Sequence, residues 1–339
     1  MKKVMCVLLI GLCLLSQAIF AGGSSDSSEV YVMKLGHDQM EDTPHHKGAL
    51  RFKELVEERT DGKVQVQIFP AQQLGTSRES IEGLQLGTVE AVVLPVSAFS
   101  GFDMPTGIVD LPFLFSSPEA GYEILDGPIG DKILSRLSRI GITGAAFWTS
   151  GTKQFTTSFP VSLPSDFKGT KIRVMASPAL IAQYEAMGAS AVPIDFNELY
   201  NALQQKAVDG EENPLSTIVN MRFYEVQKYI TLSNHGMLGY IFAFNSNWLK
   251  TLPEDYQKIL VETAKEVAPY EREMIAQLET EKYLPTIIDY GCTVTELTSE
   301  ERKVFEEVTA PAYEVYAALL DDEGKELLKE LRDAAASQN

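Results

Sequence analysis

The stretch KVQVQIFPAQQLGTSRESIEGLQLGTVEAVVLP (residues 63–95) decides the fold class of this chain. Apolar and polar residues alternate from Val64 to Ile68, which is typical of a half-buried strand. TSRE at 76–79 fits a capping box and predicts a helix through Leu86, after which VEAVVLP predicts another strand. Strand, helix and strand in this order indicate an open, mostly parallel sheet with helices on its faces.

Similar units lie on both sides of this stretch. Residues 30–37 (VYVMKLGH) predict the first strand, and Thr43 before a proline fits the cap of a helix that follows it. A second α/β unit begins after Thr149, and within it residues 215–229 predict a helix. Residues 253–289 predict one long helix with a charged side and an apolar side, long enough to lie along two domains.

We therefore expect two α/β domains. The first comprises residues 28–148 with about 236–270, and the second comprises 149–235 with about 271–298. Residues 299–339 predict a charged, helical C-terminal segment. Two α/β domains joined by more than one crossing are typical of hinged proteins that close over a ligand, which binds beyond the carboxyl ends of the strands.

The N-terminus predicts an exported protein. Two lysines, an apolar run and small residues make 1–23 a secretory signal peptide, cleaved after Ala21 or after Gly23. A lipid anchor on Cys13 is less favoured, because a leucine precedes it where a small residue is expected. The mature chain would keep Cys292 alone, which we interpret as an inert, partly buried thiol that forms no disulfide and no cysteine-based metal site.

Charge excludes one large class of partner. The 339 residues carry a net charge of −18, and loss of the two lysines of the signal peptide makes the mature chain more negative still. Nucleic-acid binding needs basic patches, so we expect no such partner. An acidic protein that binds an anion must concentrate positive charge locally, which makes a basic residue among apolar neighbours informative.

Arg173 is such a residue. It lies in GTKIRVMASP (169–178), near the carboxyl end of an apolar strand, with Lys171 and Met175 on the same side. Burying a guanidinium is costly unless an anion or several acceptors meet it, and its planar fork suits a carboxylate. The plain alternative is an edge strand with a solvated arginine.

Asn213 is a second candidate. It precedes Pro214 at the end of AVDGEENP, where its amide can both donate to and accept from a ligand. The alternative is a helix-capping turn. We interpret the adjacent Glu211 and Glu212 as charged loop residues or as acceptors for a basic group, Arg173 included, rather than as a catalytic pair.

FWTSGTKQFTT contributes Trp148, a flat wall with one indole donor, and Lys153, a mobile charge at a domain crossing. Their alternatives are core packing for the tryptophan and a solvated loop for the lysine.

Enzyme motifs with a nucleophile elbow, a zinc-binding helix or a phosphate-binding glycine loop do not occur in the sequence. His45 and His46 diverge on a helix and make poor joint metal ligands, so no motif favours an enzyme, and we expect no cofactor and no metal held by the protein alone. Whether a metal ion accompanies the ligand is left open.

The chain resembles the solute-binding proteins of tripartite ATP-independent periplasmic (TRAP) transporters, the DctP-like family. The resemblance runs from about Val30 to beyond residue 285. It rests on these stretches in this order: KLGHDQMEDTPHHKGALRF, FPAQQLGTSRESIEGLQLGTVE, DLPFLFSSPEA, KGTKIRVMASP, FNELYNALQQKAVDGEENP and FYEVQKYITLSNH.

The resemblance implies a two-domain α/β periplasmic binding protein of the type II-like class, with a hinged cleft and a long helix spanning both domains. It implies a monomeric, periplasmic receptor that delivers a small organic acid to a permease of one small and one large membrane subunit. A larger apolar monocarboxylate, an exported accessory or sensor protein with a protein partner, and a secreted hydrolase are the alternatives.

The resemblance also implies site residues. Arg173 matches the arginine that binds the ligand carboxylate, and Asn213 matches the asparagine that contacts the same ligand. Trp148 matches an aromatic wall, while Lys153 stands where relatives often carry a second arginine and so keeps the charge but not the fork. The further candidates are Arg78, Glu79, His37 and Gln39 near the cleft, and Met175, Phe196, Tyr240 and Phe155, which leave room for an apolar ligand.

Overall fold

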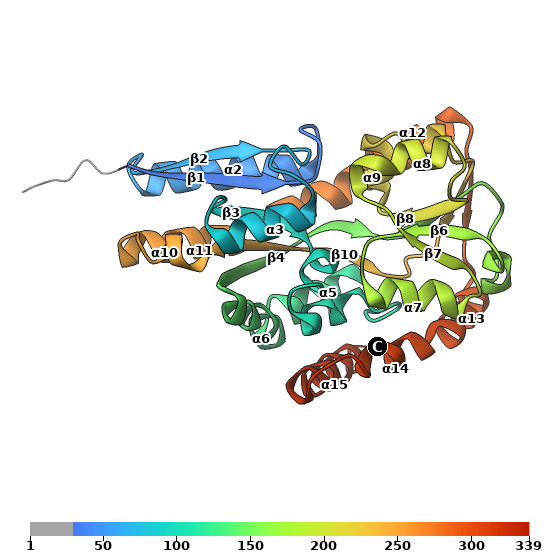
Figure 1. Ribbon diagram of the computed structural model, residues 1–339. Coiled ribbons are helices and arrows are strands. Elements are labelled where there is room, and N and C mark those ends of the chain that lie inside the picture. The colour runs from blue at the N-terminus through green and yellow to red at the C-terminus, as the bar shows by residue number, and fades with distance from the viewer. Residues whose placement is uncertain (1–29, 339) are drawn as a thin grey trace, which may run out of the picture.

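The computed structural model describes residues 30–338, which form two sheets with helices on their faces (Figure 1). The predicted signal peptide, residues 1–23, lies outside the described residues. Within 30–338, no helix combines the length and the apolar character that crossing a membrane requires.

The first sheet has five strands in the order β2-β1-β3-β10-β4. These are β1 (Tyr31–His37), β2 (Val64–Phe69), β3 (Ala91–Pro95), β4 (Ile142–Thr152) and β10 (Met237–Asn245). β1 pairs in parallel with both β2 and β3, which confirms the parallel sheet predicted from residues 63–95. β10 runs antiparallel between β3 and β4 and is buried along its whole length, because helices cover both faces of this sheet.

Helix caps explain where the helices of the first unit begin. Thr43 accepts from the backbone N–H of His46 and starts α2 (Pro44–Arg59), and Thr76 with Glu79 forms the predicted capping box of α3 (Ser77–Leu86). The remaining helices of this unit are α4 (Val96–Phe99), α5 (Pro118–Leu125), α6 (Pro128–Arg136), α10 (Ser246–Leu249) and the 3₁₀ helices Met104–Asp110 and Leu137–Ile140.

The second sheet has six strands in the order β11-β9-β5-β8-β6-β7. These are β5 (Gln154–Thr157), β6 (Lys171–Val174), β7 (Ser190–Pro193), β8 (Gly210–Asn213), β9 (Tyr229–Leu232) and β11 (Thr293–Glu296). Its helices are α7 (Pro178–Ala186), α8 (Leu199–Gln204), α9 (Leu215–Asn220) and the 3₁₀ helices Pro164–Phe167, Phe196–Glu198 and Phe223–Glu225.

The helix predicted over 215–229 is wrong in its length. α9 ends at Asn220, and Arg222 adopts a left-handed backbone conformation with φ of 59°. Such a residue stops helical hydrogen bonding, so only a short 3₁₀ turn follows before β9 begins at Tyr229.

The chain passes between the two sheets three times. It crosses at Lys153 between β4 and β5, and again between β9 and β10. The third crossing is the predicted long helix, made of α11 (Glu254–Leu278), a π-helical turn (Glu279–Tyr283) and α12 (Leu284–Tyr290). α11 packs on β4 and α2, while α12 packs beside α9, so the helix spans both units and confirms the two-domain architecture (Figure 1).

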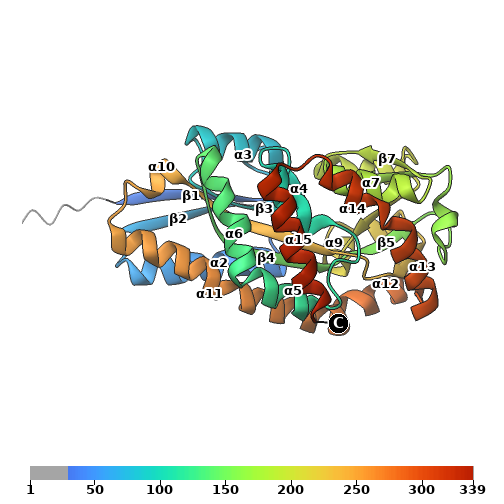
Figure 2. The same ribbon diagram turned by 90° about the horizontal axis from the view of Figure 1, so that it is seen from below.

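Three C-terminal helices lie across both units, seen from below in Figure 2. They are α13 (Ser299–Thr309), α14 (Pro311–Ala317) and α15 (Asp322–Ala336). α13 and α14 contact α7 of the second unit, and α15 contacts α5 and α6 of the first. These three helices therefore connect the two units.

Candidate functional site

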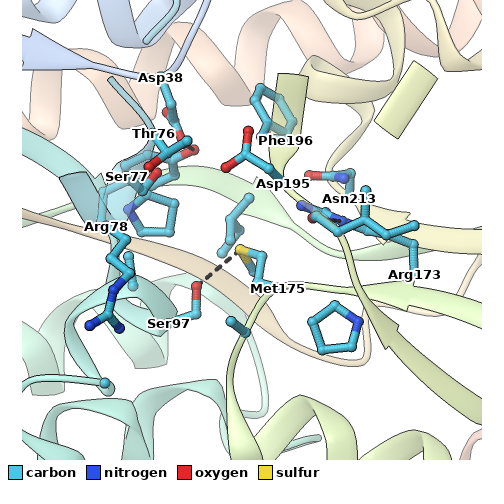
Figure 3. A pocket seen from close by; sticks show the side chains of 18 residues that line it. Asp38, Thr76, Ser77, Arg78, Ser97, Arg173, Met175, Asp195, Phe196 and Asn213 are labelled. Carbon is cyan, nitrogen blue, oxygen red and sulfur yellow. Dashed lines mark hydrogen bonds between the residues drawn. The ribbon is translucent and has the colours of Figure 1, made fainter. Parts of the chain in front are cut away.

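A cavity of about 350 Å³ opens between the two units (Figure 3). Its lining comes from both units: Asp38, Thr76, Ser77, Arg78, Pro95, Ser97, Ala98, Gly101, Leu238 and Tyr240 from the first, and Arg173, Met175, Ala176, Pro193, Ile194, Asp195, Phe196 and Asn213 from the second. This volume suits a small organic molecule. Asp38, Ser97 and Asp195 follow strand ends and Asn213 ends a strand, which is where open α/β sheets bind ligands.

Arg173 lies on β6 with its side chain only 3% exposed. Its Nε donates to the carbonyl of Ile194 at 2.9 Å, and no carboxylate within residues 30–338 forms an ion pair with it. Burial lowers the pKa of Arg173, and the negative charges of Glu211 and Glu212 oppose that shift. The guanidinium thus lines the cavity as a buried cation without a carboxylate in contact.

Glu211, offered from sequence as an ion-pair partner of Arg173, is held by other groups. Its Oε2 accepts from Asn213 Nδ2 at 2.5 Å and its Oε1 accepts from Thr156 Oγ1 at 2.5 Å. Burial raises the pKa of Glu211 to about 7, against the lowering effect of these hydrogen bonds and of Arg173. Asn213 is thereby fixed at the end of β8, where it lines the cavity beside Arg173 (Figure 3).

Lys153 does not line the cavity. Its Nζ lies 2.9 Å from Glu212 Oε1, and both side chains are almost fully buried. Glu212 Oε2 is also 2.8 Å from His235 Nε2 and accepts from Tyr184 Oη at 3.0 Å. The sequence predicted that the Lys153 ammonium contacts the ligand. In the structure it is instead paired within the protein, in a buried cluster of Lys153, Glu212, His235 and Tyr184.

Trp148 also lies away from the cavity. Its indole Nε1 donates to the carbonyl of Ala264 on α11 at 2.9 Å, and its ring packs against Phe242 and His45. Phe155 is likewise buried, stacked on His235 with ring centroids 4.1 Å apart. The structure thus places both rings in core positions, the alternative that sequence left open for the tryptophan.

Of the predicted site residues near the end of β1 and the start of α3, one lines the cavity and the others do not. Arg78 lines the cavity from an exposed position, whereas the Glu79 carboxylate accepts a hydrogen bond in the capping box of α3. His37 is buried with its Nε2 3.0 Å from Nδ1 of His46, outside the lining. Gln39 lies behind the wall and donates to Tyr240 Oη at 2.7 Å.

Three further predicted residues line the cavity: Met175, Phe196 and Tyr240. Met175 Sδ accepts from Ser97 Oγ at 3.0 Å, a contact between the two units that Figure 3 marks with a dashed line. Sequence reasoning missed the polar residues Asp38, Asp195, Thr76, Ser77 and Ser97. Within residues 30–338, no group of three or more His, Cys, Asp or Glu side chains is arranged to hold a metal ion.

Comparison with known proteins identifies the family. The model of the bacterial extracellular solute-binding proteins, family 7 (DctP), matches residues 35–319. The chain is 38% identical to the C4-dicarboxylate-binding periplasmic protein DctP of Rhodobacter capsulatus, over 91% of this chain and 92% of that protein.

Solved structures support the same family assignment. A TRAP periplasmic solute binding protein from Desulfovibrio salexigens with bound orotic acid gives a TM-score of 0.88 at 39% identity, covering 91% of this chain and 99% of that one. The sugar acid binding protein DctPAm from Advenella mimigardefordensis in complex with galactonate gives a TM-score of 0.86 at 32% identity, covering 92% and 99%. The chain therefore belongs to family 7 of the bacterial extracellular solute-binding proteins, the DctP family.

Proposed function

We propose that this protein is the extracytoplasmic receptor of a TRAP transporter and binds a small organic acid in the cavity between its two units. The observation that carries the proposal is Arg173, a buried cation on the cavity wall with no carboxylate of the described residues in contact with it. A ligand carboxylate supplies the partner that burial of a guanidinium requires.

Asn213 supports the same assignment. Its side chain lines the cavity next to Arg173, and its amide nitrogen is oriented by the Glu211 carboxyl group. The amide can therefore add a hydrogen bond to the carboxylate that Arg173 holds, which gives direction as well as charge to the contact. Arg173 and Asn213 both come from the second unit, so an acid bound there presents its far end to the first unit.

Family membership supports the remaining parts of the proposal. The N-terminal 23 residues would direct export and be removed, and the closed receptor would deliver its acid to the small and large membrane subunits of the permease. Met175, Phe196 and Leu238 give the cavity apolar surface as well, so a larger apolar monocarboxylate is the second candidate for its content.

The proposal is tested by titrating the mature protein with a panel of acids in a calorimeter, after native mass spectrometry has identified any acid retained through purification. Binding of at least one carboxylate in the micromolar range or below is expected, together with a raised midpoint of thermal unfolding. Absence of binding by every acid of the panel, from short hydroxy acids to aliphatic and aromatic monocarboxylates, would refute the proposal.

A further inference from the structure

A buried carboxylate faces the cavity from the first unit. Asp38 follows β1 directly, is 3% exposed and lines the cavity. Its Oδ1 accepts from Gln39 Nε2 at 3.2 Å, and its Oδ2 lies 3.5 Å from Tyr240 Oη, which accepts from the same Gln39 amide at 2.7 Å. This cluster fixes the carboxylate in place, and no cation within residues 30–338 forms an ion pair with it.

A second carboxylate enters the cavity from the other unit. Asp195 is half-buried after β7 and lines the same space. One of its oxygens, Oδ1, accepts from the backbone N–H of Asn197 at 3.1 Å. Figure 3 shows the Asp195 carboxylate turned toward the side of the cavity where Asp38 lies, away from Asn213. The cavity therefore sets two carboxylates, one from each unit, against the single buried cation Arg173, which both of them influence electrostatically.

A dicarboxylate would place its second carboxylate against these two groups. Like charges brought together in a partly desolvated site repel each other strongly, whereas a ligand hydroxyl donates a charge-assisted hydrogen bond to a carboxylate. Gln39 and Tyr240 already donate to Asp38, so the remaining lone pairs of its carboxylate can accept from one or two ligand donors. A hydroxyl supplies such a donor and adds no negative charge, so it fits beside Asp38 better than a second carboxylate does.

Arg78, the other cation of the lining, does not offset this charge. Its Nε lies 2.9 Å from Glu82 on the same helix, and its guanidinium lies 5.3 Å from the ring centre of Phe102. The side chain is largely exposed, and Figure 3 shows its guanidinium turned away from Arg173 and Asp38. Arg78 therefore does not provide a buried cation for a second carboxylate of the ligand.

We propose, resting on the proposed function, that the solute is a monocarboxylate whose far end carries hydroxyl groups, and that Asp38 sets this specificity. Asp38 accepts hydrogen bonds from the ligand hydroxyls and repels a second carboxylate. Asp195 adds to both effects from the opposite wall. Such selectivity differs from the C4-dicarboxylate binding that the Rhodobacter capsulatus relative is named for.

Matched pairs of acids test this proposal. Glycerate with tartronate, erythronate with meso-tartrate, and galactonate with galactarate share their carbon number and inner hydroxyls, and differ in a terminal CH₂OH against COO⁻. Calorimetry at pH 8 is used, because burial raises the pKa of Asp38 to about 6 and the group is then charged. In the pair that binds most tightly, we expect the monocarboxylate to bind at least tenfold more tightly than the dicarboxylate.

Variants assign the effect to Asp38. Asp38→Asn should lower the mono-to-dicarboxylate ratio at least tenfold, and Asp195→Asn should lower it by a smaller factor. Asp61→Asn removes an equal charge from an exposed turn after α2 and should leave the ratio unchanged. Asp195→Asn serves as the second variant should Asp38→Asn fail to fold.

Three outcomes overturn the inference: a wild-type preference for the dicarboxylate or for an amino acid of the same length, a preference for the acid without hydroxyls, or a ratio that both cavity variants leave unchanged. Failure of every acid to bind refutes the proposed function itself. Binding of dicarboxylates in preference to hydroxy monoacids refutes the specificity alone, so the two failures are distinguishable.

Discussion

Lys153 Nζ and Glu212 Oε1 lie 2.9 Å apart, with the two side chains 1% and 2% exposed. Lys153 sits where the chain first crosses between the sheets, and its backbone N–H donates to the carbonyl of Gly236 at the second crossing. Burial alone would raise the pKa of Glu212, but Lys153 and the hydrogen bond with His235 outweigh it and hold that pKa well below its usual range. The ion pair therefore stabilises the point where two of the crossings meet.

Lys153→Met should lower the free energy of unfolding by about 3 kcal/mol, because it leaves the Glu212 charge buried without its cation. The remaining donors to Glu212, among them Tyr184, keep the loss near the lower end for a broken buried pair. Urea denaturation measures the change, and Lys250→Met, an exposed lysine after α10, is the control. Equal losses in the two variants would contradict this role.

The same substitution should move the titration of His235. Burial lowers the pKa of His235 most, Glu212 raises it, and the charge of Lys153 lowers it further. Removing that charge leaves Glu212 as the dominant neighbour, so the pKa of His235 should rise in Lys153→Met. An NMR titration of the imidazole signals measures the shift, and an unchanged His235 curve in the variant would show that the two groups do not interact.

Glu279 makes stability fall as the pH rises from about 4 to about 7. It lies in the π-helical turn of the long helix, its Oε1 has no hydrogen-bond partner, and burial raises its pKa to about 7. An acid whose pKa is raised in the folded state contributes stability below its unfolded pKa, near 4.3, and loses that contribution as pH rises through the folded value. Glu279→Gln should therefore raise the free energy of unfolding at pH 8, relative to wild type, by about 1–3 kcal/mol more than it does at pH 4.

Denaturation curves of Glu279→Gln and wild type at pH 4 and pH 8 measure this difference. The comparison between the two pH values removes any constant effect of the new amide. Glu273→Gln, a substitution at an exposed position on α11, is the control. A Glu279→Gln effect that is the same at both pH values would show that the carboxyl group titrates normally.

Arg173→Ala should weaken binding of the acid identified by calorimetry by about 2–5 kcal/mol, because the ligand carboxylate loses its charged partner. Arg173→Lys should recover only part of this loss, since an ammonium keeps the charge without the planar fork. Lys171→Ala removes a positive charge from an exposed position on the same strand and serves as the control. Unchanged affinity in Arg173→Ala would mean that the acid binds elsewhere.

Local signals in the sequence were sufficient for much of the fold. Alternation from Val64 to Ile68 and the capping box at Thr76 and Glu79 depend on neighbouring residues alone, and the structure forms both as predicted. The end of α9 was not predictable in the same way, because it depends on the left-handed conformation of Arg222, a residue type with no preference for it.

The site was less accessible to sequence reasoning, for physical reasons. Trp148 and Lys153 lie on chain segments close to the cavity, but which way a side chain points there depends on partners far along the chain, Ala264 and Glu212. Asp38 carried a usable signal, since it directly follows a strand whose carboxyl end faces the cavity. Sequence reasoning instead singled out its two neighbours.

Arg136 should hold the C-terminal helices on the first unit. Its side chain is 4% exposed, Nε and Nη2 contact Asp103 at 3.0 and 3.1 Å, and Nη2 also contacts Asp321, the cap of α15, at 3.1 Å. Arg136→Met would leave Asp103 buried without its cation, so we expect a loss of about 3–5 kcal/mol in the free energy of unfolding. Faster amide exchange should accompany it along α15.

Lys132→Met provides a control on the same pair of helices. Lys132 Nζ lies 2.6 Å from Glu330 of α15, but the lysine is 57% exposed, and an exposed pair contributes only about 0–1 kcal/mol. Removing it should therefore leave exchange along α15 nearly unchanged, while Arg136→Met accelerates it. Equal exchange in the two variants would show that α15 is held on the first unit by its apolar face and not by Arg136.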